Sequence, residues 1–212
     1  MKNNYGVFII ESLRSDDYFD GEVLKDILEL AKVPVRYEWV ETKEELENKL
    51  SDFAKSRFRY LHISCHADYE GLRLTNDGIS NEIFGKMTKG KIKNKRVFLS
   101  ACKGGNRNLA SVLIKNGAYS LIGSPNDLHF DKAALFWASF FHVVNEFDDK
   151  KMKKAEIRHV LKSCVDLFYI PINYYTYIET KRNKMMRRLK LRPEKKVDNR
   201  IVRIKTIPSD TI

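Results

Sequence analysis

Residues 96–105 read RVFLSACKGG. Its first six residues, Arg96 to Ala101, are mostly apolar and β-favouring, which predicts a buried central strand of a parallel sheet. Cys102 follows this strand directly, and two glycines come shortly after it. In open α/β sheets, functional groups gather just beyond the carboxyl ends of the strands. The stretch therefore predicts a central strand with a cysteine at its carboxyl end, where functional groups of such a sheet usually lie.

Strand-like and helix-like patterns alternate on both sides of this stretch. Short apolar runs predict strands over Tyr5–Ile10, Val35–Val40, Tyr60–Ser64 and Tyr119–Ile122, with a short edge strand over Leu72–Thr75. Between them, apolar residues recur at helical spacing around residues 23–31, 42–53, 81–87, 109–113, 133–144 and 151–168. This alternation predicts an α/β fold whose mostly parallel central sheet is covered by helices on both faces.

Two local signals predict where helices begin and end. Thr42-Lys43-Glu44-Glu45 has the order of a capping box, in which the threonine and the second glutamate satisfy backbone N–H groups at a helix start. Asn116-Gly117 is a helix stop, because glycine tolerates the left-handed conformation that ends many helices.

The C-terminal part of the chain differs in charge from the rest. Residues 150–212 hold 18 Lys or Arg and 6 Asp or Glu, whereas residues 1–149 hold 21 basic and 22 acidic side chains. We therefore expect a main domain over residues 1–170 and a basic extension over residues 171–212 that packs on the same domain. The extension ends in a β-like piece, Ile201–Ile207.

The cysteine content and the hydropathy pattern indicate a soluble, cytoplasmic protein. Three cysteines are too few, and odd in number, for a disulfide framework, and they fit a reducing compartment. The N-terminal residues lack the apolar run of a secretory signal. The longest uncharged central stretch, Ala133 to Asn145, has 13 residues, short of the roughly 20 that span a bilayer. His129, His142 and His159 have no partners at metal-binding spacing, so we expect neither metal nor cofactor.

A histidine stands after another predicted strand in the same way as Cys102. The strand Tyr60–Ser64 is followed by Cys65 and His66. Adjacent parallel strands would bring these two chain segments together at one edge of the sheet. A Cys becomes a nucleophile when a nearby His raises its thiolate fraction, and glycines after it let backbone N–H groups approach a developing oxyanion. The pattern indicates a Cys–His pair.

Further motifs surround this pair in a fixed order. They are Leu61–His66 (LHISCH), Gly71–Leu74 (GLRL), Val97–Gly105 (VFLSACKGG), Gly117–Gly123 and Ala133–Phe136. Together they resemble the CHAT peptidases, which are relatives of caspases, metacaspases and separase within clan CD of the cysteine peptidases. The resemblance covers residues 58–142 well, and the flanks agree only in general pattern.

The resemblance implies a role for each matching residue. His66 would be the catalytic histidine and Cys102 the nucleophile, with the Cys102 and Gly104 amides helping to bind the oxyanion. Ala67 stands where the family usually has an oxyanion-pocket glycine. His62 would be a strand residue and not the acid–base group.

The other cysteines have structural explanations. Cys65 should point to the opposite side of the sheet from His66, because side chains alternate along a strand. Cys164 lies on the apolar stripe of a predicted helix and should belong to the core.

Substrate selection would need an acidic side chain to favour Arg or Lys before the scissile bond. The loop over residues 124–131 stands where separase-like relatives keep such an acid. Asp127 is the first candidate and Asp131 the second, while a solvent-exposed or helix-capping role for Asp127 stays open. We expect cleavage after Arg, and after Lys as the second preference.

Two functions from different classes fit these residues. The first is a signal-activated endopeptidase that acts on protein substrates; by the resemblance it would be a bacterial anti-phage effector switched on by a nucleotide messenger or a partner protein. The second is a non-catalytic caspase-like binding module whose basic tail binds nucleic acid or a phosphorylated ligand. The cluster Lys181–Arg188 could be such a binding surface, a solvated face or a self-cleavage site. Under the first function, nucleic acid and membranes are not expected partners, and the oligomeric state stays open.

Overall fold

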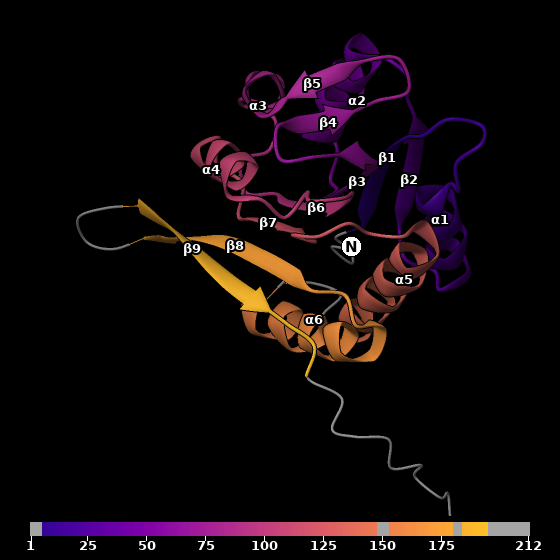
Figure 1. Cartoon of the computed structure of the whole chain (residues 1–212), viewed down its shortest axis with the longest axis vertical. Helices are drawn as coiled ribbons and strands as arrows, with labels where there is room; N and C mark the ends of the chain where they lie inside the picture. The colour runs from indigo at the N-terminus through magenta and orange to yellow at the C-terminus, as the bar shows by residue number, and fades with distance from the viewer. Residues whose placement is uncertain (1–5, 148–152, 180–183, 195–212) are drawn as a thin grey trace, which may run out of the picture.

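A single sheet organises the protein. The computed structural model describes residues 6–147, 153–179 and 184–194 (Figure 1). The strand order is β2-β1-β3-β6-β7-β8-β9. In that order the strands are Val35–Trp39, Val7–Ser12, Tyr60–Ala67, Arg96–Ser100, Ser120–Gly123, Ile172–Glu179 and Lys184–Leu191. The first five run parallel, and β8 and β9 add an antiparallel hairpin at one edge.

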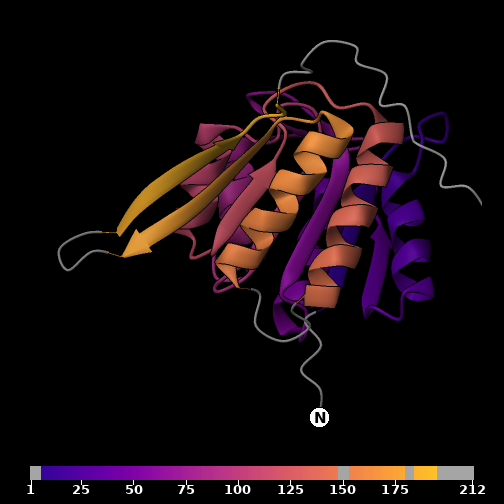
Figure 2. The same cartoon turned by 90° about the horizontal axis from the view of Figure 1, so that it is seen from below.

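Helices cover both faces of the sheet. On one face lie α1 (Asp20–Leu30), α5 (Phe130–Phe147) and α6 (Lys154–Phe168), and Figure 2 shows α5 and α6 side by side across it. On the other face lie α2 (Lys43–Lys55), α3 (Asn81–Thr88) and α4 (Arg107–Lys115). The small strands β4 (Gly71–Arg73) and β5 (Gly78–Ser80) form a hairpin paired with the end of β3. The predicted α/β fold with a mostly parallel, helix-covered sheet is confirmed.

Local sequence signals account for several element ends. The Thr42 side chain accepts a hydrogen bond from the Glu45 N–H at 3.3 Å, and the Glu45 carboxylate accepts one from the Thr42 N–H at 3.1 Å, which completes the predicted capping box. Helix α4 ends before Gly117, which has a left-handed φ of 92°.

Strand alternation divides the apolar residues into two cores. Phe98 and Ile122 face α5 and α6, whereas Leu99 and Leu121 face the opposite layer of helices. The aromatic residues of α5 pack in the first of these cores, with the Phe141 ring 4.9 Å from the Phe98 ring.

The structure differs from the expected elements in two places. Strand β3 continues to Ala67, so that Cys65 and His66 lie within the strand and not after it. Residues 172–191 carry the hairpin β8–β9, which the sequence did not predict, and β9 contains Arg187 and Arg188 of the basic cluster. The β-like piece Ile201–Ile207 lies outside the described residues.

The hairpin belongs to the same sheet as the strands before it. Strand β8 pairs antiparallel with β7, with Ser120 opposite Thr176 and Gly123 opposite Asn173. Its Tyr174 and Tyr175 are buried, one on each face of the sheet. The segment after residue 170 therefore closes the edge of β7.

Among the described residues, no helix is both long and apolar enough to cross a membrane.

A buried histidine lies at the centre of the first core. His62 is fully buried, and its ring packs edge-on against Trp137 at 5.5 Å and Phe141 at 5.7 Å. Neither ring nitrogen has a hydrogen-bond partner in the described part of the chain. Burial lowers the pKa of His62 to about 3, so the imidazole is neutral in the folded protein.

His62 should make a pH-dependent contribution to the free energy of unfolding. Its pKa is lower in the folded state than the value of about 6.5 in an unfolded chain. The unfolded state therefore binds the extra proton, and the contribution of His62 to the free energy of unfolding decreases as the pH falls from about 6.5 toward 3. Between about pH 7 and pH 5 the loss attributable to His62 is about 2 kcal/mol. We expect His62→Leu to remove most of this loss, as measured by urea unfolding at the two pH values. If the free energy of unfolding changes between the two pH values by the same amount in the variant as in the wild type, the assignment is wrong.

Candidate active site

Parallel pairing of β3 with β6 brings His66 and Cys102 to one place. Ser64 and Ser100 are register partners on these strands, and His66 and Cys102 each stand two residues further along. Both therefore project from the same face of the sheet, the face that α1 and α5 cover. His66 and Cys102 line one cavity of about 150 Å³, together with Leu128, His129 and Phe130 among others.

The His66 imidazole is held by contacts on two sides. Its Nε2 lies 3.1 Å from the Asp17 carboxylate, which comes from the loop between β1 and α1. The ring packs edge-on against Phe130 at 5.5 Å. The same Asp17 oxygen accepts a hydrogen bond from the Arg14 N–H at 3.0 Å, which fixes the loop. A carboxylate in this position orients the ring.

The Cys102 thiol contacts the loop between β7 and α5. The Leu128 N–H donates to Sγ at 3.3 Å, and the thiol points to the Leu128 carbonyl at 3.7 Å. Cys102 itself is half-buried. The thiol is thus open to the cavity but has a backbone partner on one side.

The expected oxyanion groups differ in their availability. Among the described residues, the Cys102 N–H has no hydrogen-bond acceptor. The Gly104 N–H donates to the Ala101 carbonyl at 3.2 Å and is engaged within the turn. Ala67 is the last residue of β3 and pairs with Leu72 of β4. Of these two amides in the turn, the Cys102 N–H is therefore the one free to donate.

A close approach between two strand ends shapes the turn after Cys102. The Gly105 N–H donates to the Ser124 carbonyl at 2.7 Å, and a Cβ on Gly105 would lie 2.1 Å from the Gly123 oxygen. Only glycine fits at this position. Asn173 and Tyr175 of β8 donate to the Gly105 carbonyl at 2.7 and 3.2 Å. The antiparallel hairpin therefore supports the turn that carries the thiol.

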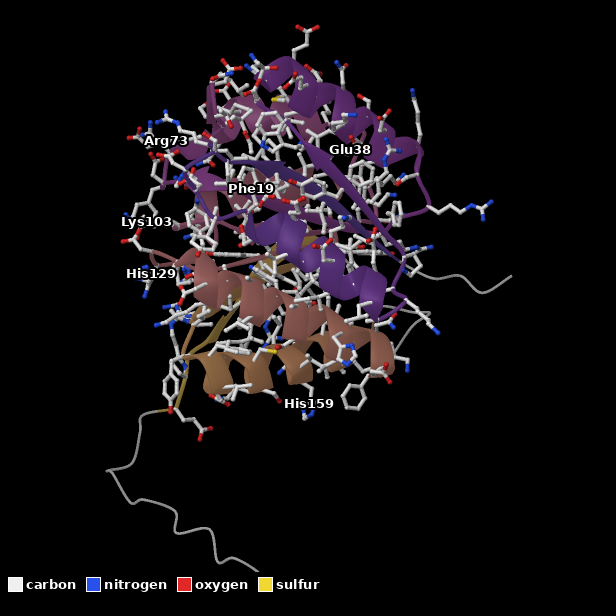
Figure 3. All side chains as sticks on the ribbon, turned by 90° about the vertical axis from the view of Figure 1, so that its right-hand side faces the viewer. Phe19, Glu38, Arg73, Lys103, His129 and His159 are labelled. Carbon is white, nitrogen blue, oxygen red and sulfur yellow. The ribbon has the colours of Figure 1, made fainter. Side chains whose placement is uncertain are left out.

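The two acidic residues expected to select substrates lie outside the cavity. The Asp127 carboxylate is 3.2 Å from the Lys103 ammonium, and its side chain is 71% exposed. Asp131 is exposed in the first turn of α5. Figure 3 shows Lys103 and His129 projecting along the same edge of the molecule as Arg73.

A second cavity adjoins His66 on its other side. It has a volume of about 270 Å³, and its lining includes Asp16, Asp17, Arg14 and Arg73. The Arg73 guanidinium pairs with Asp68 at 2.7 Å, while Asp16 is exposed. His66 therefore stands between the cavity of the thiol and a cavity that carries two carboxylates.

Sequence reasoning missed Asp17, Leu128 and Asn173. The acidic pair Asp16-Asp17 follows the first strand at the same edge of the sheet. This placement was the one sequence signal that could have revealed Asp17. Leu128 acts through its backbone, and Asn173 lies in the segment that the sequence separated from the main domain. Over the described ranges, no group of three or more His, Cys, Asp or Glu is arranged to hold a metal ion.

Comparisons with known proteins identify the fold. No protein-family model matches the sequence, and a search of curated proteins gives no match either. Among solved structures, the Arg-specific cysteine proteinase gingipain R superposes with a TM-score of 0.54 at 12% identity, over 78% of this chain and 43% of that chain. Caspase-1 from Spodoptera frugiperda superposes with a TM-score of 0.51 at 11% identity, over 90% of this chain and 88% of that chain. The chain has a caspase-like fold. It corresponds to less than half of the gingipain chain.

The three thiols should differ in reactivity. Burial raises the pKa of the Cys65 thiol, and it raises the pKa of Cys164 to about 11. Cys65 and Cys102 both contribute to the lining of the cavity beside His66, but Cys65 is buried whereas Cys102 is half-buried. At about pH 8 we expect iodoacetamide to modify Cys102 at least about tenfold faster than the other two, as measured by mass spectrometry of the digested protein. Comparable rates at Cys65 would show that the strand faces are assigned incorrectly.

Proposed function

We propose that the chain is a cysteine endopeptidase in which Cys102 is the nucleophile and His66 the general base and acid. One observation carries the proposal: the imidazole and the thiol, from the ends of two paired parallel strands, line a single cavity. The likeness to two cysteine proteinases supports it at the level of the fold.

The mechanism follows from the placement of the groups. His66 accepts the thiol proton, and the Cys102 thiolate attacks the carbonyl carbon of the scissile peptide bond. The Cys102 amide donates to the oxyanion that forms on the carbonyl oxygen. His66 then gives its proton to the leaving amine, and the carbon–nitrogen bond breaks. Water, deprotonated by His66, hydrolyses the resulting thioester and regenerates the thiol. The Asp17 carboxylate stabilises the imidazolium in each half of the cycle.

Activation by a signal would act on the loop over the thiol. Leu128 contacts Cys102 Sγ through both backbone groups, and an entering substrate carbonyl needs the space beside the same atom. A shift of residues 124–130 would free the thiol. By the CHAT resemblance, a nucleotide messenger or a partner protein in a cytoplasmic anti-phage response would supply that signal.

A preference for basic residues has a specific source in this site. Asp127 is paired with Lys103, so its charge is already compensated. The cavity on the other side of His66 carries Asp16 and Asp17, and Asp17 bonds the imidazole. We therefore assign the recognition of an Arg or Lys side chain before the scissile bond to this cavity, with Asp16 as the pairing carboxylate.

A binding module remains the second candidate function. Arg187, Arg188 and Lys190 are exposed on the edge strand β9, where a phosphate-bearing ligand could pair with them. Under this function the Cys–His pair would be silent.

Substitution of the nucleophile separates the two functions. Expressed with its genomic neighbours, the wild-type chain should generate new peptide ends in cellular proteins, and Cys102→Ala should generate none. His66→Ala should lower the cleavage rate at least about a hundredfold, the usual contribution of general acid–base catalysis. Mass spectrometry of newly formed N-termini measures both effects.

The matched control is Cys164→Ala. Cys164 is a buried thiol in α6, away from the cavity, and its loss should leave the pattern of new ends unchanged. New ends that persist in Cys102→Ala would refute the peptidase. If His129→Ala loses cleavage while His66→Ala stays active, His129 and not His66 is the general acid and base.

The assignment of substrate recognition to Asp16 predicts a second, graded effect. Asp16→Asn should lower kcat/KM about fivefold for peptides with Arg before the scissile bond, because an exposed ion pair contributes up to about 1 kcal/mol. Peptides with a neutral residue there should be cleaved at an unchanged rate. The comparison variant is Asp127→Asn, which leaves the cavity intact. A larger effect from Asp127→Asn would return substrate selection to the loop over residues 124–131.

A further inference from the structure

A buried carboxylate connects the two strands that carry the candidate catalytic pair. Asp20 is the first residue of α1 and is 2% exposed. One of its oxygens accepts a hydrogen bond from the Ser64 hydroxyl, and the other accepts one from the Ser100 hydroxyl at 2.6 Å. Both serines are buried. The carboxylate therefore bridges β3 and β6 through one side chain on each.

The bridge lies directly beneath His66 and Cys102. Ser64 precedes His66 by two residues and Ser100 precedes Cys102 by two, so all four side chains project from one face of the sheet. Beyond this point the ladder between the two strands ends, because the last paired residues are the serines themselves. The bridge is the last connection between the strands before the imidazole and the thiol.

The position of Asp20 is itself fixed by a second buried carboxylate. Glu11 of β1 accepts hydrogen bonds from the Gly21 and Glu22 N–H groups at 2.7 and 3.1 Å, and from the Tyr37 hydroxyl at 2.8 Å. These contacts cap the start of α1 from the sheet. A Cβ on Gly21 would lie 2.9 Å from the Glu11 oxygen, so glycine permits the approach.

Two buried carboxylates at this edge are costly to the fold. Burial raises the pKa of Glu11 to about 7 and that of Asp20 to about 6, although hydrogen bonds oppose both shifts. Stability alone favours apolar groups at such positions. These buried carboxylates lie next to the Cys–His pair although they destabilise the fold. Their retention there points to a role in the site.

We propose that Asp20 is a positioning residue, whose carboxylate holds Ser64 and Ser100 together and thereby sets the separation of the His66 imidazole and the Cys102 thiol. This inference rests on the proposed function, because it concerns the same Cys–His pair. The bridge restricts how far the ends of β3 and β6 can separate when a substrate enters between them.

The test measures the reactivity of the Cys102 thiol and does not depend on peptide hydrolysis. The rate of Cys102 alkylation by iodoacetamide is followed against pH by mass spectrometry of the peptide that contains Cys102. In the wild-type protein, His66 can accept the thiol proton, so we expect faster alkylation at about pH 6 than in His66→Ala. Asp20→Ala, which removes the bridge, should lower the rate at about pH 6 about tenfold.

A conservative variant distinguishes the bridge from the charge. In Asp20→Asn the amide can accept a hydrogen bond from one serine and donate one to the other, so the bridge survives without the charge. We expect its alkylation rate to stay within about threefold of wild type. An Asp20→Asn profile equal to that of Asp20→Ala would overturn the bridging role in favour of the charge.

The control for stability is Thr88→Val. Thr88 is buried in α3, donates to the Phe84 carbonyl at 2.9 Å and accepts from Asn116 at 3.0 Å. Its loss should lower the melting temperature and leave the alkylation profile unchanged. If Asp20→Ala likewise changes only the melting temperature, Asp20 is structural and the inference is wrong. If the wild type and His66→Ala have the same alkylation profile, the Cys–His pair is silent. In that case both the proposed function and the inference about Asp20 are wrong.

Discussion

The register between β3 and β6 is the constraint on which the candidate site depends. Because Ser64 pairs with Ser100, His66 and Cys102 leave the sheet on the same face at its carboxyl edge. A slip of one residue in either strand would send one of the two groups into the opposite core, where Cys65 lies. Packing above and below the strands specifies that register, since each strand buries a different set of side chains on each face.

The functional edge is a composite of segments that are distant in sequence. The loop after β1 supplies Asp17, the loop after β7 supplies Leu128, and β8 supplies Asn173. The turn after Cys102 can approach the β7 end only because Gly105 has no side chain. Topology explains this convergence, because the parallel strands β1, β2, β3, β6 and β7 end at one edge of the sheet. The antiparallel strand β8 begins at that same edge, where Asn173 pairs with Gly123.

The elements with strong periodicity could be predicted from the sequence, and so could the residues that follow them. Strand β6 is continuously buried, and its RVFLS sequence has that signature. The hairpin β8–β9 escaped prediction because KMMRRLKL has no clean alternation of apolar and polar residues and its burial depends on the neighbouring strand. The sequence alone could not show which of Asp17 and Asp127 contacts the candidate catalytic pair. The first meets the imidazole and the second meets Lys103 only through the conformation of their loops.

The hairpin also governs how the sheet ends. Strand β7 is buried along its whole length, and without β8 its open backbone groups would face solvent as a template for other chains. Strand β9 instead presents Arg187, Arg188 and Lys190, and β2 at the far edge presents Arg36 and Glu38. Like charges on β9 repel a second copy of the same strand. The protein is thus protected against edge-to-edge association at the β9 edge, and a chain cut before residue 172 would lose that protection.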